Sequence, residues 1–112
     1  MDIEVRSPGQ VKVVKLRGKL SLGDSVDRLR ETMDDLIASG STYIVLDLVE
    51  VPMIDSSGIG LLVKNLTSAK QLGGSIKLVN PSKFVIQTLK MIGLLNLFDV
   101  FEDQQQAVAS FG

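Results

Sequence analysis

Apolar and polar residues alternate near the start of the chain with the two-residue period of a β-strand. The segment VKVVKLRG, residues 11–18, places valine and leucine side chains on one side and lysine and arginine on the other. This alternation is typical of a strand in a sheet with one partly solvated face. A shorter alternating segment, IEVR at residues 3–6, precedes it, and the Pro-Gly pair between the two segments is a turn signal. The pattern predicts a hairpin.

Three later segments carry apolar residues three and four positions apart, which is the spacing of a helix buried on one side. They cover residues 24–39, 56–72 and 81–92, and a glycine follows each as a helix terminator. Asp24 or Ser25 is expected to cap the first helix, and Ser82 opens the third. The apolar stripes consist of Val26, Leu29, Met33, Leu36 and Ile37, then Ile59, Leu62, Val63, Leu66 and Ala69, then Phe84, Val85, Leu89 and Ile92.

The remaining segments complete an alternation of strands and helices. Residues 43–48, YIVLDL, are continuously apolar apart from one aspartate, as in a central parallel strand, and residues 75–80 form a shorter strand. A last strand is expected around Val100, followed by a terminal helix near residues 104–111. The order ββαβαβαβα predicts an α/β fold and a single domain over residues 1–112, because strands joined through helices pair in parallel.

Composition removes several classes of function. The 112 residues include no cysteine and no histidine, which excludes disulfides, thiolate nucleophiles and the usual general base and zinc ligands. We therefore expect no metal, no cofactor and no enzymatic activity. The net charge of −1 and the 4% of aromatic residues argue against nucleic-acid binding. The polar N-terminus differs from a secretory signal, and no apolar run is long enough to cross a bilayer, so a cytoplasmic protein is expected.

The segment VPMIDSSGIGLLV, residues 51–63, contains the candidate chemistry. Ser56 and Ser57 follow Asp55 at the junction between a strand and a helix, where ligands gather in open α/β sheets. Free amides at a helix start attract anions, and Gly58 and Gly60 should leave the first turn open to a partner. The simpler interpretation is that a serine caps the helix. A serine hydrolase and a phosphate-binding P-loop are both excluded, because the required histidine and lysine are missing.

The stretch IVLDLVEVPMIDSSGIGLLV resembles the signature of the STAS domain, in particular that of bacterial anti-sigma-factor antagonists. The flanking segments VKLRGKL and GGSIKLVNPSKFVIQTLKMIGL resemble the same family, so the likeness covers essentially the whole chain. It implies a mixed, mostly parallel sheet of four to five strands, with the first strand antiparallel and about four helices mainly on one face. The lysine and arginine side chains of Lys15, Arg17 and Lys77 fit a second face that is partly wet.

The resemblance also implies a switch. In the family, the first serine after the aspartate is phosphorylated by a protein kinase that is itself the anti-sigma factor. Here that residue is Ser56, with Ser57 as the second candidate. The unmodified protein would bind the anti-sigma factor and release the sigma factor; the kinase would use ATP to switch the protein off, and a PPM-type phosphatase would reset it.

The expected partner surface combines two loops with the outward side of the second helix. Leu61, Lys64, Asn65 and Ser68 fall off the predicted apolar stripe, so Leu61 is either an exposed anchor or a core residue. The family often has an acidic residue after its Gly-x-Leu turn, whereas this chain has Ser21 there. Partner choice or kinase recognition would then differ. The expected partner-binding residues are Ser21, Asp24, Asp55, Ser57, Gly58, Ile59, Gly60, Leu61 and Lys64.

Three other functions remain open at this point. The chain could be a scaffold subunit of a STAS-built signalling complex, or the soluble STAS subunit of an ABC transporter for lipids or solutes. A nucleotide-binding role is also conceivable, although the sequence contains no phosphate loop.

Overall fold

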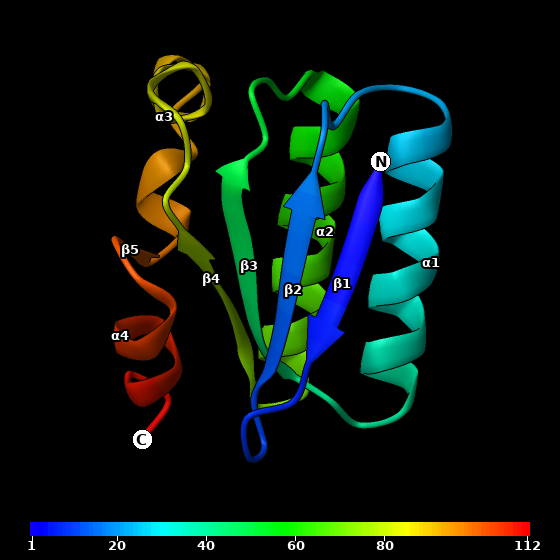
Figure 1. Ribbon diagram of the computed structural model, residues 1–112, viewed down its shortest axis with the longest axis vertical. Helices are drawn as coiled ribbons and strands as arrows, with labels where there is room; N and C mark the ends of the chain where they lie inside the picture. The colour runs from blue at the N-terminus through cyan, green and yellow to red at the C-terminus, as the bar shows by residue number, and fades with distance from the viewer.

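Strands and helices alternate along the chain after an initial hairpin (Figure 1). The computed structural model describes all residues, 1–112. Its strands are β1 (Asp2–Arg6), β2 (Lys12–Arg17), β3 (Tyr43–Glu50), β4 (Ser75–Val79) and β5 (Val100–Phe101), and its helices are α1 (Asp24–Ala38), α2 (Ser56–Gln71), α3 (Lys83–Met91), the short 3₁₀ helix η1 (Leu95–Leu97) and α4 (Gln104–Ala109). The predicted element order is confirmed, and only η1 was not predicted.

The five strands form one mixed sheet in the order β1-β2-β3-β4-β5. β1 pairs antiparallel with β2, and the other three pairs are parallel. The α/β class and the mixed, mostly parallel sheet are therefore confirmed. Between Lys15 and Arg17 the register of β2 against β3 shifts, so that Arg17 lies opposite Glu50. The C-terminal ends of β2 and β3 point to the same edge, at the top of Figure 1.

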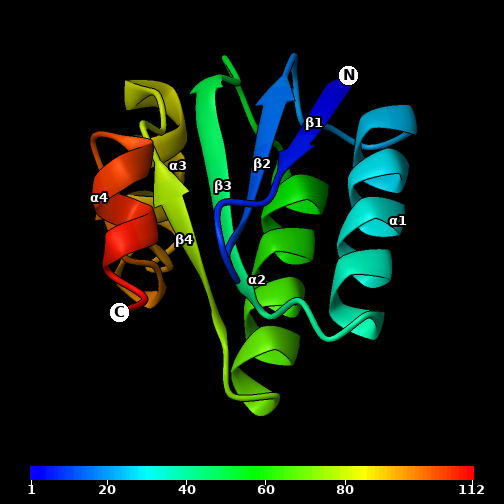
Figure 2. The ribbon, with the colours of Figure 1, turned by 60° about the horizontal axis from the view of Figure 1, so that its bottom comes forward.

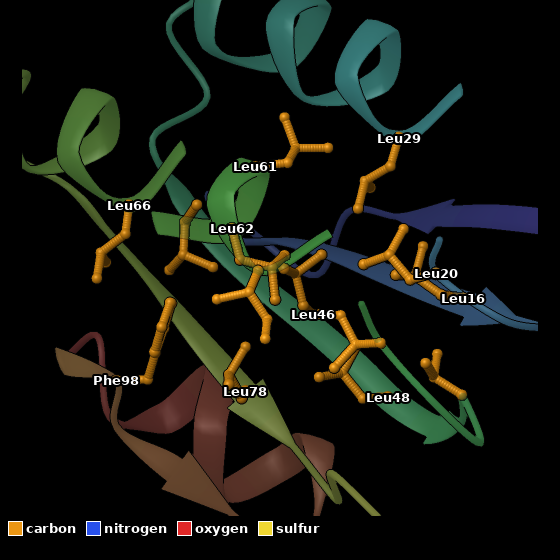
Figure 3. Close-up of a cluster of buried hydrophobic side chains, with 14 of the residues drawn as sticks. Leu16, Leu20, Leu29, Leu46, Leu48, Leu61, Leu62, Leu66, Leu78 and Phe98 are labelled. Atoms are coloured by element: carbon orange, nitrogen blue, oxygen red, sulfur yellow. The ribbon is translucent and has the colours of Figure 1, made fainter. Parts of the chain in front are cut away.

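The larger core lies between one face of the sheet and the first three helices. Buried residues of β2, β3 and β4 pack there against apolar residues of α1 and α2 (Figure 3), and Val85 and Leu89 of α3 belong to the same core. α1 and α2 lie side by side along the sheet (Figure 2), and α2 is therefore covered on two sides. The predicted stripe of α3 is only half correct, because Phe84 and Ile92 are each 52% exposed while Val85 and Leu89 are fully buried.

A smaller core lies on the other face of the sheet, beneath α4. Ala107 packs there against Val13, Val45 and Val79. Lys77 belongs to this side and is only 8% exposed, so the prediction of a wet position was wrong for this residue. Its Nζ donates to the Ser110 hydroxyl at 2.7 Å because α4 and the residues after it fold over this half of the sheet.

The uncovered half of that face carries ion pairs. Arg17 and Lys15 both lie within salt-bridge distance of Glu50, at 3.1 Å and 3.3 Å, and Arg17 also reaches Glu4. Lys15 and Arg17 are thus partly solvated, as predicted. The side chains of Lys15 and Arg17 donate hydrogen bonds to the Glu50 carboxylate and hold its pKa below the usual value. All of these side chains are solvent-accessible, so the network keeps this sheet face polar and contributes little to stability.

Candidate functional site

The loops that follow β2 and β3 are joined by backbone hydrogen bonds. Leu20 forms a parallel bridge with Ile54. The Leu20 amide donates to the Met53 carbonyl, and the Asp55 amide donates to the Leu20 carbonyl, each at 3.1 Å. The structure therefore brings the segment from Ser21 to Asp24 against residues 55–60, which we call the double-serine motif, although more than thirty residues separate the two segments in sequence.

Asp55 caps α2, and its carboxylate accepts a hydrogen bond from the first turn of that helix and another from the loop after β2. Its Oδ1 accepts the Gly58 amide at 3.0 Å, and its Oδ2 accepts the Leu22 amide at 2.8 Å. These amide donors, Leu22 first and Gly58 second, lower the pKa of Asp55 below its ordinary value. The expectation that a serine caps this helix was wrong, because the residue before the two serines occupies the cap position.

Ser56 and Ser57 are consequently the first two residues of α2, not its cap. The Ser56 side chain is exposed, the Ser57 side chain is half-buried, and neither hydroxyl forms a hydrogen bond within the protein. The amides of the first helical turn and the helix dipole favour negative charge beside them. The chain has no histidine to activate a serine as a nucleophile. The arrangement suits a hydroxyl that accepts a group from an external enzyme and then carries a negative charge.

The two glycines after the serines play different parts. Gly58 is buried, and a Cβ added there would lie 2.8 Å from Ile54 Cγ1 and 2.9 Å from the Leu20 carbonyl oxygen. Gly58 thus permits the close contact between α2 and the two loops. Gly60 is exposed, and nothing lies within 4 Å of a Cβ added there. The expected open first turn is therefore found at Gly60 and not at Gly58.

Leu61 is a core residue. It is 4% exposed, and Figure 3 shows it near Leu29 of α1. The exposed-anchor interpretation of Leu61 is excluded by this burial, and the placement of Asn65 off the buried side was wrong as well, because Asn65 is 2% exposed. Asn65 follows Leu61 by one helical turn, so the two lie on the same side of α2. Because α1 packs beside α2, a single apolar stripe facing the sheet does not describe the whole buried surface of this helix.

The expected partner-binding residues divide by exposure. Asp24, Gly60 and Lys64 are exposed, and Ser21, Asp55 and Ser57 are half-buried at the same end of the sheet. Gly58, Ile59 and Leu61 are buried, so their side chains are not available to a partner in this fold. Likewise, α1 is capped at Gly23 and not by the side chain of Asp24 or Ser25.

Leu22 is a surface residue that sequence reasoning missed. Its side chain is 79% exposed and lies in the loop that Asp55 holds. The available signal was weak: Leu22 stands between Ser21 and Gly23, outside any helical stripe, where a leucine has no predicted core to join.

The site is an open surface and not a small-molecule cavity. The largest hollow, of about 480 Å³, lies between the first hairpin and α4. The other two lie at the end of the sheet away from the two serines. No residue of the double-serine motif lines any of the three. The structure contains no group of three carboxylates close enough to hold a metal ion. Each helix is too short or too polar to cross a membrane.

Comparisons with known proteins agree with this geometry. The family model described as the STAS domain matches residues 2–107. The chain is 28% identical over 109 residues to the anti-sigma F factor antagonist of Paenibacillus polymyxa, an alignment covering 96% of this chain and 92% of that protein. It is 30% identical over 99 residues to the anti-sigma-B factor antagonist of Bacillus subtilis (strain 168), with coverages of 88% and 81%.

A solved structure shares the fold at lower sequence identity. The Bacillus cell fate determinant SpoIIAA in its phosphorylated form superimposes with a TM-score of 0.78 at 21% identity, over 99% of this chain and 100% of that one. The match to the family model, the shared fold and the double-serine motif at the start of α2 lead to one assignment. The chain belongs to the STAS domain family.

Proposed function

We propose that this protein is an anti-sigma-factor antagonist that is switched off by phosphorylation of Ser56. Unmodified, it binds an anti-sigma factor and thereby releases a sigma factor. The observation that carries the proposal is the Ser56 hydroxyl, which is exposed at the first position of α2 and has no internal partner because Asp55 caps the helix. Two curated relatives named as anti-sigma factor antagonists support the general role.

Ser56 is the preferred acceptor over Ser57 because of its exposure. A kinase must bring the γ-phosphate of ATP within bonding distance of the hydroxyl, and Ser56 is the more accessible of the two side chains. Phosphate placed there also lies beside the N-terminal amides of α2, which stabilise negative charge. The phosphorylated protein should therefore remain folded, so the switch acts on binding and not on stability.

Charge is sufficient to turn binding off. Phosphorylation adds about −1.5 to −2 charges at neutral pH, next to the ionised Asp55 and within the proposed contact surface. An unpaired charge enclosed in an interface typically costs about 2–5 kcal/mol. A hundredfold loss of affinity requires only about 2.7 kcal/mol. No change of fold is needed.

The proposed cycle has three proteins. The partner is an anti-sigma factor that is also a serine kinase and uses ATP, and a PPM-type phosphatase removes the phosphate. The contact surface consists of the accessible residues at this end of the sheet, including Ser21, Asp24, Gly60 and Lys64. Such a cycle takes place in the cytoplasm, and the antagonist itself catalyses no reaction.

The test is phosphorylation of the purified protein by each anti-sigma kinase of the host with ATP, followed by mapping of the modified residue. Ser56→Ala should abolish labelling and retain binding of the kinase. Ser56→Asp should fold normally and bind weakly. Ser57→Ala is the matched control, and it should be labelled at Ser56 like the wild-type protein.

Other outcomes would redirect the proposal. Labelling that persists in Ser56→Ala and disappears in Ser57→Ala would move the acceptor by one residue. If no kinase labels or binds the wild-type protein, the antagonist role is rejected. A large stable homo-assembly would then favour a scaffold subunit, and co-purification with a membrane ATPase would favour a transporter subunit.

A further inference from the structure

We propose that Leu22 is the apolar anchor by which the unmodified protein holds its anti-sigma partner, and that Asp55 is the residue that positions it. The inference rests on the proposed function, because it concerns the same surface. It assigns to the partner an apolar pocket that admits one leucine side chain. It also gives Asp55 a part in binding that acts through another residue.

The first support is exposure at a fixed place. Leu22 is 79% exposed and belongs to neither core, and its backbone amide is bonded to Asp55, the residue before the exposed Ser56. A single exposed leucine is common on protein surfaces and carries no meaning alone. Here the main chain on both sides of Leu22 is held.

The second support is the set of hydrogen bonds that hold this loop. The Ser21 amide donates to the Ser25 hydroxyl at 2.9 Å, and that hydroxyl donates back to the Ser21 carbonyl at 2.9 Å. The preceding residue, Leu20, forms a parallel β-bridge with Ile54, in the loop just before the double-serine motif. An anchor whose backbone is already ordered loses little conformational entropy on docking, which increases its contribution to affinity.

The third support is the bond from the Leu22 amide to Asp55 Oδ2, at 2.8 Å. It joins the backbone of the anchor directly to the cap of α2, one residue before the phosphate acceptor. The anchor and Ser56 therefore occupy one rigid surface. A partner whose pocket encloses Leu22 would therefore dock at the end of α2 that carries the Ser56 hydroxyl, as a kinase acting on Ser56 must.

The experiment measures the affinity of the kinase that labels Ser56 for variants of this loop. Leu22→Ser should weaken binding about tenfold or more, because it removes the apolar side chain that the partner's pocket would bury. Leu72→Ser is the matched control, because Leu72 is 61% exposed at the opposite end of α2; it should bind like the wild-type protein. Both substitutions are at exposed positions, so both variants should fold.

The role of Asp55 requires a variant that keeps the helix cap. In Asp55→Asn, one side-chain oxygen still accepts the Gly58 amide, but the other group is an amide that cannot accept from Leu22. The Leu22 amide proton should then exchange faster with solvent while the Gly58 amide stays protected. Binding should weaken, and the double variant with Leu22→Ser should lose little more than Leu22→Ser alone.

The results separate the two proposals. Equal affinities of the wild-type protein and Leu22→Ser would overturn the anchor while leaving the phosphorylation switch intact. Losses that multiply in the double variant would show that Asp55 contacts the partner independently and does not act through Leu22. A wild-type protein that binds no anti-sigma kinase would reject both the anchor and the proposed function.

Discussion

Gly58 packs against Leu20 so closely that a Cβ at Gly58 would lie 2.9 Å from both the carbonyl oxygen and the Cγ of Leu20. The contact joins the first turn of α2 to the loop that follows β2. It determines how near the double-serine motif approaches the neighbouring loop, and hence the shape of the surface proposed to bind the partner.

The first prediction compares the two glycines of the motif. Gly58→Ala should lower the free energy of unfolding by about 1–3 kcal/mol, because the backbone carbonyl of Leu20 cannot move aside as a flexible side chain would. Gly60→Ala should raise it by up to about 1 kcal/mol, since alanine is the better helix former and the space is open. Urea unfolding measures both, and a similar change in the two variants would contradict the packing described at Gly58.

The second prediction tests the burial of Leu61. Leu61→Ala should reduce the free energy of unfolding by about 2–5 kcal/mol, because it leaves a cavity between α2 and α1. Leu72→Ala, at the exposed C-cap of the same helix, should change it by less than about 0.5 kcal/mol. If the two substitutions proved equally mild, Leu61 would have to be a surface residue after all.

The third prediction concerns the buried amide of Asn65, whose Nδ2 has no hydrogen-bond partner. An unsatisfied buried donor typically costs about 1–3 kcal/mol. Asn65→Leu removes the donor with a side chain of similar size and should stabilise the protein. Thermal and urea unfolding give the sign of the change. Asn96→Leu, at an exposed position, should have almost no effect, and a destabilised Asn65→Leu would mean that the amide is satisfied in solution.

The fourth prediction is a pH dependence that arises at Asp55. The folded-state pKa of Asp55 lies below the ordinary aspartate value of about 3.9, because Leu22 and Gly58 donate to its ionised form. A depressed pKa contributes stability that is fully present above about pH 4 and is lost as pH falls through the folded-state value. The free energy of unfolding of the wild-type protein should therefore decrease in this acidic window.

Asp55→Asn isolates that contribution, because asparagine does not titrate. Its stability should depend less steeply on pH below about pH 4 than that of the wild-type protein. Glu50, whose pKa is also lowered, is present in both proteins and cancels in the comparison. Parallel pH profiles of the two proteins would show that the amide bonds to Asp55 do not favour its ionised form.

The comparison of sequence and structure at the motif shows where local reasoning is reliable. The strand before Asp55 and the helix after it were predicted because their apolar periods depend only on neighbouring residues. The identity of the cap was not, since aspartate and serine both cap helices well and the choice depends on where the chain turns. That turn is determined by the bridge between Leu20 and Ile54, which joins distant segments.

By itself, the sequence determined the order of strands and helices and the mixed sheet, and it proposed Ser56 as the phosphate acceptor, because each follows from a local pattern or motif. Only the tertiary structure decided which side chains remain accessible. Leu61 and Asn65 are buried although they lie off the predicted stripe, and α4 with the residues after it covers Lys77. Asp55 caps α2 and accepts the Leu22 amide, while the Ser56 side chain stays exposed. The burial of a side chain depends on contacts with segments far apart in the chain, and these contacts cannot be predicted from the spacing of apolar residues within one segment.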